Sequence, residues 1–148
     1  MGEDKSKEQN VSRFCTVMTQ FKDRTALIAA LVETGNWSIE QIEIHNTPQN
    51  LFGYKGDQRT EVANIIIRRK FIGIASNDIG LVLGKDNCYE IIVSKYDQSK
   101  YGTKWISQLK GNYVYHKLKQ DQEGRGRRVS RTRCPQTGKQ RIEISGYR

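Results

Sequence analysis

The sequence predicts an α+β fold: a single domain, mainly an antiparallel sheet, with two helices packed on one face. Two segments have the apolar spacing of helices, and the other apolar segments are short and separated by turn residues. Such short connections join only antiparallel neighbours. Strands outnumber helices and do not alternate strictly with them, which argues against a parallel sheet. A chain of 148 residues is long enough for one domain with terminal tails.

The first two predicted elements are a strand and a helix. Residues 13–21 are rich in β-branched and aromatic side chains interleaved with Thr and Gln, which favours a strand. Asp23 is a suitable N-cap for the helix that follows, and Gly35–Asn36 provides the left-handed residue that ends it. The apolar stripe of this helix consists of Leu27, Ile28, Leu31 and Val32.

The middle of the chain predicts an antiparallel meander. Residues 39–45 alternate between apolar and polar side chains, which indicates a half-buried strand. A loop follows at Pro48 and Gly53, where turn-forming residues interrupt the pattern. The next strands are expected at residues 62–69, 71–75, 80–83 and 89–93.

A second helix and a final strand pair complete the predicted order. The helix begins near Thr103, and its apolar face consists of Trp105, Ile106, Leu109 and Tyr113. Strands at about 127–134 and 140–146 then flank a turn at 135–139. The elements therefore follow the order β-α-β-β-β-β-α-β-β.

Charge is distributed unevenly along the chain. Residues 1–100 carry 13 Lys or Arg and 13 Asp or Glu, whereas residues 101–148 carry 12 against three, so that the net charge of +9 lies entirely in the last third. We therefore divide the chain into a disordered N-terminal tail (1–11), an α+β core domain (12–124) and a basic C-terminal hairpin or tail (125–148).

The basic stretch predicts contact with a nucleic-acid backbone. It holds seven cations, six of them Arg, a residue that pairs with phosphate in a bidentate manner and stacks on bases. Arg127, Arg131 and Arg133 fall on one face of the predicted strand, at separations of about 7 to 13 Å. The candidate binding residues are Arg125, Arg127, Arg128, Arg131, Arg133, Lys139, Arg141, Lys110, Lys117, Lys119, Tyr113 and Tyr115, the two tyrosines offering rings for base stacking. The alternatives are an arginine-rich edge hairpin that prevents aggregation and a site for an acidic protein.

Catalytic and metal chemistry find little support in the sequence. His45 and His116 are the two histidines, no metal-ligand spacing occurs, and the three cysteines indicate a reducing compartment without a disulfide framework. Cys134 lies among cations that favour a thiolate, so a reactive thiol is the alternative to an incidental cysteine. In the loop 53–56, Lys55 could meet an anion, although an ordinary structural loop is the alternative. We expect no enzyme activity, no cofactor and no metal.

Several landmarks resemble an uncharacterised family typified by a hypothetical chloroplast reading frame of red-algal plastids and cyanobacteria. They are Ser12-Arg13-Phe14, Gly53-Tyr54-Lys55-Gly56, the strand Val62–Arg68, Asp78-Ile79-Gly80, Cys88–Val93, Gln108-Leu109 and Tyr113-Val114-Tyr115. The resemblance covers about residues 12–124 and implies one domain of unknown function without established catalytic residues. The chain departs from the family at Ser94–Asp97 and in its cationic stretch after residue 124.

These observations lead to one expected function and one alternative. We expect a non-enzymatic basic module that contacts nucleic acid, RNA or single-stranded DNA in preference to duplex, through its C-terminal hairpin. The alternative is an accessory or structural subunit of a larger assembly, viral or plastid and cyanobacterial, that docks on acidic protein. No apolar run approaches the length of a membrane span, so we expect no membrane partner. The polar N-terminus shows neither a secretory signal nor a transit peptide, so we expect an intracellular protein that is not secreted.

Overall fold

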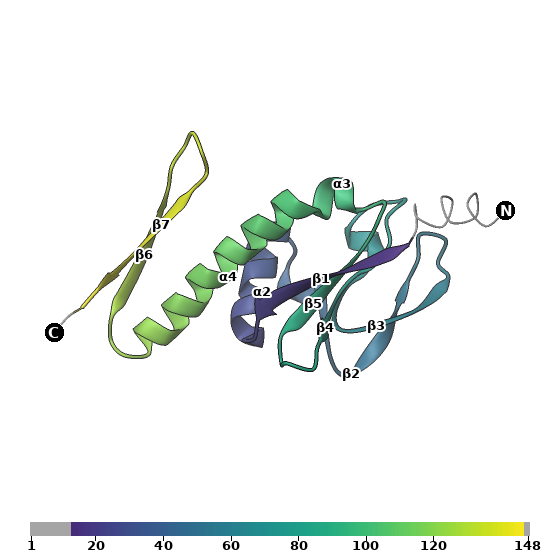
Figure 1. The fold of residues 1–148 in the computed structure, drawn as a ribbon, viewed down its shortest axis with the longest axis horizontal. Helices are drawn as coiled ribbons and strands as arrows, with labels where there is room; N and C mark the ends of the chain where they lie inside the picture. The colour runs from purple at the N-terminus through teal and green to yellow at the C-terminus, as the bar shows by residue number, and fades with distance from the viewer. Residues whose placement is uncertain (1–12, 147–148) are drawn as a thin grey trace.

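The computed structural model describes residues 13–146 and centres on a five-stranded antiparallel sheet (Figure 1). The strands lie in the order β1-β5-β4-β3-β2 and pair antiparallel throughout. Their bounds are β1 Phe14–Phe21, β2 Ile42–Phe52, β3 Gln58–Ile67, β4 Ile79–Leu83 and β5 Tyr89–Ser94. The predicted α+β fold and antiparallel sheet are therefore confirmed. The expected tail at 1–11 lies outside the described residues.

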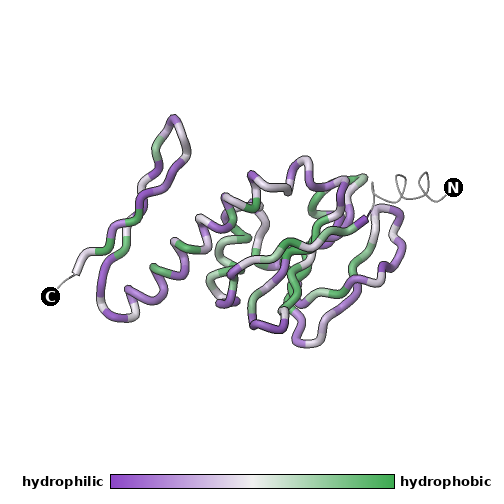
Figure 2. Tube along the Cα trace, viewed as in Figure 1, coloured by the Kyte–Doolittle hydropathy of each residue, from purple (hydrophilic) through white to green (hydrophobic). Residues whose placement is uncertain are grey.

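Two helices, α2 (Arg24–Gly35) and α4 (Thr103–Glu123), pack on each other and on one face of the sheet (Figure 1). The predicted cap of α2 is confirmed, because the Asp23 carboxylate accepts a hydrogen bond from Ala26 N at 2.9 Å and Asn36 is left-handed with φ 57°. Leu27, Leu31 and Leu109 are fully buried between the helices and the sheet. Figure 2 shows the hydrophobic positions concentrated in this layer.

The second face of the sheet is partly covered by the β2–β3 hairpin. The pairing of these strands shifts register between Ile44 and Gln49, where Pro48 lies. Beyond this bulge Leu51 packs on the sheet above Gly80, where an added Cβ would stand 2.9 Å from a Leu51 methyl. Because Gly80 has no side chain, the end of β2 that carries Leu51 can lie close to the sheet.

A separate two-stranded sheet, β6 (Arg128–Arg133) and β7 (Gln140–Ser145), follows α4 and contacts that helix (Figure 1). It is drawn in yellow at the end of the molecule opposite the start of β1. No helix in residues 13–146 is long and apolar enough to cross a membrane.

Two of the predicted elements differ from the structure. Residues 71–75 are not a strand: a 3-10 helix, Arg69–Phe71, leads into turns, because the carbonyls of this segment accept hydrogen bonds from the Arg69 side chain. Pro48 lies within β2 instead of a loop, at the bulge where a missing N–H is tolerated. The structure also adds a short helix, α3 (Gln98–Tyr101), that the sequence pattern did not reveal.

Candidate nucleic-acid interface

The β6–β7 hairpin has an inner face toward the helices and an outer face toward solvent. Val129 is 7% exposed and pairs with Ile144, so that odd positions of β6 and even positions of β7 form the inner face. Arg131 and Arg133 share that inner face. The outer face carries Arg128 and Arg141, which lie at opposite ends of the strand pair.

Arg131 anchors the hairpin to both helices. Its guanidinium lies 3.8 Å from the centroid of the Tyr115 ring and 2.9 Å from a Glu33 carboxylate oxygen. It also donates a hydrogen bond to the side-chain oxygen of Asn112 at 3.1 Å. These contacts join α2, α4 and β6, and leave the Arg131 side chain 18% exposed. Arg131 therefore holds the hairpin in place and is not available to a phosphate.

Glu33 is the acceptor at the centre of this junction. It accepts a hydrogen bond from His116 at 2.8 Å and lies 3.6 Å from Arg133 in addition to its pair with Arg131. Burial by itself would raise the pKa of Glu33, but the hydrogen bonds from His116 and Arg131 outweigh burial, and the pKa is lowered. The carboxylate thus remains charged and keeps the junction closed at neutral pH.

A second contact fixes the register of the hairpin on α4. Gln140 Nε2 donates a hydrogen bond to the Gly111 carbonyl at 2.6 Å, and a Cβ at position 111 would stand 3.4 Å from that nitrogen. A glycine in the middle of a helix lowers its stability, and this one lies where Gln140 of the hairpin reaches the helix backbone.

Several of the predicted binding residues are engaged within the protein. Lys117 pairs with Asp121 and Asp23, Lys119 pairs with Glu123, and Arg127 donates a hydrogen bond to Gln122. Arg133 joins the Glu33 junction described above. The structure thus places Arg131 and Arg133 on the inner face of β6, toward Glu33, whereas Arg127 precedes the strand and is exposed. The three side chains do not form one open face, and their contact with phosphates stays a prediction.

The structure also engages the two tyrosines within the protein. Tyr113 is 8% exposed, packs against Phe21 and accepts hydrogen bonds from the backbone N–H groups of Lys22 and Asp23, so its ring is a core residue and is not accessible to a base. One side of the Tyr115 ring is covered by Arg131. Base stacking on these two rings is not supported by the structure.

The remaining predicted cations are exposed around the hairpin, with one exception. Within residues 13–146 the side chains of Arg125, Arg128 and Lys139 have no ion pair, and Arg141 has only an exposed pair with Glu143 at 3.9 Å. Lys110 lies elsewhere, beside Val17 of β1 in a shallow pocket. The outer face, the turn and the segment after α4 therefore offer Arg125, Arg128, Lys139 and Arg141 to an anion. We call these four the hairpin cations.

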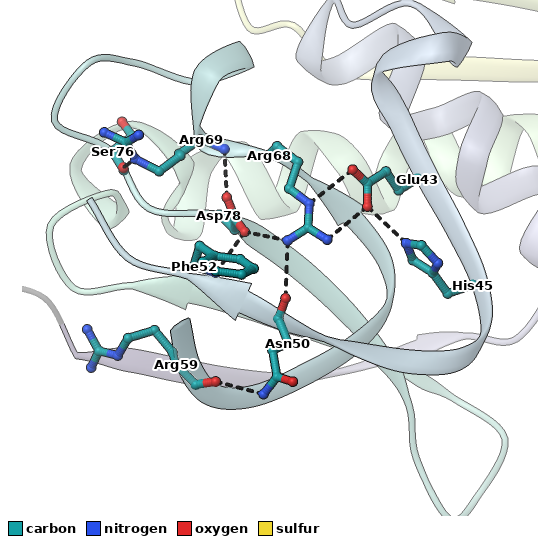
Figure 3. Close-up of polar contacts among 9 residues, drawn as sticks. All are labelled: Glu43, His45, Asn50, Phe52, Arg59, Arg68, Arg69, Ser76 and Asp78. Carbon is teal, nitrogen blue, oxygen red and sulfur yellow. Dashed lines mark hydrogen bonds and ion pairs between the residues drawn. The ribbon is translucent and has the colours of Figure 1, made fainter. Parts of the chain in front are cut away.

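A second polar cluster, at the other end of the sheet, surrounds Arg68 (Figure 3). Its guanidinium donates a bidentate pair of hydrogen bonds to Glu43, at 3.0 and 2.9 Å, and a further one to Asp78 at 2.8 Å. Asp78 is fully buried and also accepts hydrogen bonds from the N–H groups of Phe52 and Arg69. Burial by itself would lower the pKa of Arg68, but Glu43 and Asp78 raise it. The cluster braces β2 against the segment after β3, and sequence spacing gave no signal for it.

The two histidines and the three cysteines lie in separate segments of the described part of the chain. His45 contacts Glu43 at 2.9 Å, and no group of His, Cys, Asp and Glu there is suited to a metal ion. Cys134 is exposed in the hairpin turn, and hydrogen bonds from the Thr137 hydroxyl and from the backbone of Thr137 and Gln136 lower the pKa of its thiol. These donors in the turn, not the neighbouring cations, account for the shift.

Comparisons with known proteins identify a family and no individual relative. No curated protein and no solved structure matches the chain. A family model described as "Protein of unknown function (DUF1257)" matches residues 40–142. The match runs from the start of β2 into β7, and thus includes the Arg68 cluster and most of the hairpin. Because it covers more than half of the sequence, the chain belongs to this family.

Proposed function

We propose that the protein is a non-enzymatic binding module whose hairpin cations contact the phosphate backbone of nucleic acid. The observation that supports this proposal is the outward placement of Arg125, Arg128, Lys139 and Arg141. Among residues 13–146 the first three have no ion pair with a carboxylate, and Arg141 has only the exposed pair with Glu143. Arg128 and Arg141 lie on one face, with Arg141 opposite Thr132, so they are about 13 Å apart along the strands. Cations at this spacing can contact phosphates along a single strand.

The proposed contact is directed to the backbone and not to the bases. Arg131 and Tyr113, which the sequence offered for binding, serve the hairpin junction and the core instead. The hairpin cations therefore supply charge without a reader of base edges, and affinity should depend strongly on salt and weakly on sequence. We favour RNA or single-stranded DNA because a flexible strand adapts to a narrow hairpin face.

The test is a salt titration of binding to single-stranded RNA, single-stranded DNA, duplex DNA and heparin. The variant Arg128→Gln/Lys139→Gln/Arg141→Gln changes exposed side chains only and should fold normally. Loss of three phosphate contacts should reduce the slope of log affinity against log salt by about 2. The matched control is Lys55→Gln/Lys70→Gln/Lys95→Gln, which removes the same charge at the other end of the molecule and should leave the slope unchanged. Equal slopes for the two variants would contradict the proposal.

The alternative is an accessory subunit of an assembly, of viral or of plastid and cyanobacterial origin, whose same cations dock on acidic protein. It differs from the first proposal in one measurable way. A subunit of this kind binds heparin as well as any nucleic acid and has no preference among the three nucleic acids. A clear preference for single strands over heparin would exclude it.

A further inference from the structure

Three loops meet at the end of the sheet opposite the hairpin: the β2–β3 turn, the segment after β3 and the β5–α3 connection (Figure 1). The buried side chain of Asn77 joins them. Its oxygen accepts a hydrogen bond from Tyr54 N at 2.8 Å, and its nitrogen donates to Ser94 Oγ at 2.8 Å. The backbone N–H of Asn77 donates to the Asp97 carboxylate at 2.9 Å. The three loops are therefore held together by one residue.

Arg69 fixes the tip of this surface. Its guanidinium donates hydrogen bonds to the backbone carbonyls of Tyr54 at 2.7 Å, Ile74 at 2.9 Å and Ser76 at 3.1 Å. Because the acceptors are neutral carbonyls, the positive charge of Arg69 is not compensated by them. The loop that carries Ile74 has a defined conformation, which is visible for Arg69 and Ser76 in Figure 3.

The side chains at this surface are unusually exposed for their type. Ile74 is 96% exposed, the highest exposure among the large hydrophobic residues of the described part of the chain. A single exposed aliphatic residue is ordinary, so its significance depends on what the neighbouring loops add. Tyr54 and Tyr96, one on each of the other two loops, are 40% and 48% exposed. An exposed aliphatic residue and two half-exposed tyrosines on loops joined by Arg69 and Asn77 have the side-chain composition of the interface between water and lipid.

The same loops and α3 carry five cations. They are Lys55, Arg69, Lys70, Lys95 and Lys100, drawn from all three loops and α3. Over residues 13–146 none of the five forms an ion pair with a carboxylate, and the Lys55 and Lys70 ammonium groups lie instead over the rings of Tyr54 and Phe71, at 5.6 and 5.1 Å. Of the acids near these loops, Asp97 is buried and Asp57 faces Arg59 at 3.7 Å. The surface is therefore basic as well as apolar.

From this juxtaposition we infer that the loop surface formed by Tyr54, Lys55, Lys70, Ile74, Lys95 and Tyr96 binds an anionic lipid bilayer. Ile74 enters the boundary between headgroups and acyl chains, the tyrosines lie at the headgroup level, and the lysines contact lipid phosphates. A nucleic-acid backbone offers nothing to an exposed isoleucine, and this favours lipid as the partner.

The experiment is co-sedimentation of the full chain with vesicles of phosphatidylcholine alone and of phosphatidylcholine mixed with phosphatidylglycerol. We expect binding to the anionic vesicles only, with a marked decrease at high salt. Ile74→Ser should weaken binding about tenfold, since it removes the inserted side chain from a position without packing contacts. Lys55→Gln/Lys70→Gln/Lys95→Gln should weaken it about a hundredfold.

The hairpin variant Arg128→Gln/Lys139→Gln/Arg141→Gln is the matched control and should bind anionic vesicles as the wild type does. This design separates the inference from the proposed function, which fails if the hairpin variant keeps wild-type nucleic-acid binding. Absence of binding to anionic vesicles at low salt would overturn the inference. Unchanged vesicle binding by Ile74→Ser would also overturn it. A third contradicting result is a wild-type protein that does not bind vesicles while Lys55→Gln/Lys70→Gln/Lys95→Gln loses nucleic-acid binding, because the surface would then be a nucleic-acid site.

Discussion

The two ends of the molecule are both basic, but their charge is assembled in different ways. At the hairpin, seven cations lie within 17 residues of sequence, yet Arg131 and Arg133 turn inward to Glu33. At the loop end no comparable run exists, and the cations come from separate segments joined by Asn77. A run of cations in the sequence therefore overstates how many of them are available to a ligand. A basic surface that is built from several separate loops is not detected by a search for such runs.

The two ends are also braced differently, which is open to direct test. The loop end depends on Asp78, which is fully buried, whereas the hairpin junction depends on Glu33, whose side chain is 32% exposed. A buried carboxylate that loses its partner is much more costly than a half-exposed one. Loss of an arginine should consequently lower the free energy of unfolding more at the loop end than at the hairpin.

The largest effect is expected for Arg68→Met. This change leaves the buried carboxylate of Asp78 without its cation and should lower the free energy of unfolding by about 3–5 kcal/mol. Urea denaturation followed by circular dichroism measures it. The control is Arg59→Met, which breaks a pair of 3.7 Å with the exposed Asp57 and should cost about 1 kcal/mol or less. Equal losses for the two variants would remove the distinction between buried and exposed braces.

A smaller and local effect is expected for Arg131→Met. The hairpin contacts the rest of the protein chiefly through α4 and Glu33, so loss of Arg131 should loosen β6 and β7 without unfolding the five-stranded sheet. Hydrogen exchange should show protection in residues 129–133 falling about tenfold, which corresponds to ~1.4 kcal/mol. Arg141→Met, on the outer face, should leave protection unchanged. A uniform loss of protection in the sheet as well would show that the hairpin is part of the main cooperative unit.

The attachment of the hairpin should also depend on pH. The pKa of Glu33 is lowered from its ordinary value of 4.5. The stabilisation that the Glu33 carboxylate gives to the attached hairpin is therefore complete above pH 4.5 and is lost as the pH falls through the pKa of Glu33 in the folded protein. Protection factors of the hairpin amides should therefore decrease by a few-fold from about pH 6 to about pH 4. Glu33→Gln should have weaker protection at neutral pH and a flatter profile. A wild-type profile that matches the variant would argue against this role of Glu33.

The smallest effect concerns reactivity and leaves stability unchanged. Hydrogen bonds in the hairpin turn lower the pKa of the Cys134 thiol, whereas burial and then Asp86 raise that of Cys88. Iodoacetamide at neutral pH should consequently modify Cys134 before Cys88, as peptide mass mapping would show. Thr137→Val removes a donor and should slow the modification of Cys134. Faster labelling of Cys88 would mean that the turn does not hold the geometry described.

Much of the fold followed from the sequence because it depends on local signals. Asp23 and Asn36 cap the two ends of α2 as predicted. The predicted apolar face of α4 is buried at Trp105, Ile106 and Leu109. The prediction of a strand at 71–75 is wrong because it treats a run of apolar residues as buried. In the structure Ile74 lies at the surface, and Arg69 donates a hydrogen bond to its backbone carbonyl. Side-chain hydrogen bonds to backbone carbonyls leave no trace in an apolar pattern.

The candidate site was predicted less well, for a similar reason. The alternation of side chains along the strand correctly placed Arg131 and Arg133 on one face, but it did not predict that this face points to the helices. That direction is set by burial of Val129 and by the contacts of Arg131 with Glu33 on α2 and Asn112 on α4. The exclusion of a membrane partner rested on the lack of a spanning segment, a criterion that does not address a bilayer contacted by loops. Lys55 was noted in the sequence as a cation that could meet an anion, and its neighbours on the other loops became apparent only in three dimensions.

The pairing of β1 with β5 has a consequence for synthesis of the chain. Phe14 lies opposite Ser94, so the first strand has no partner in the five-stranded sheet until about 70 further residues have been translated. At about 5–20 residues per second, this interval lasts roughly 4 to 15 s. During that time β5 cannot cover Phe14 and Phe21, which makes β1 a segment that a ribosome-associated chaperone can bind.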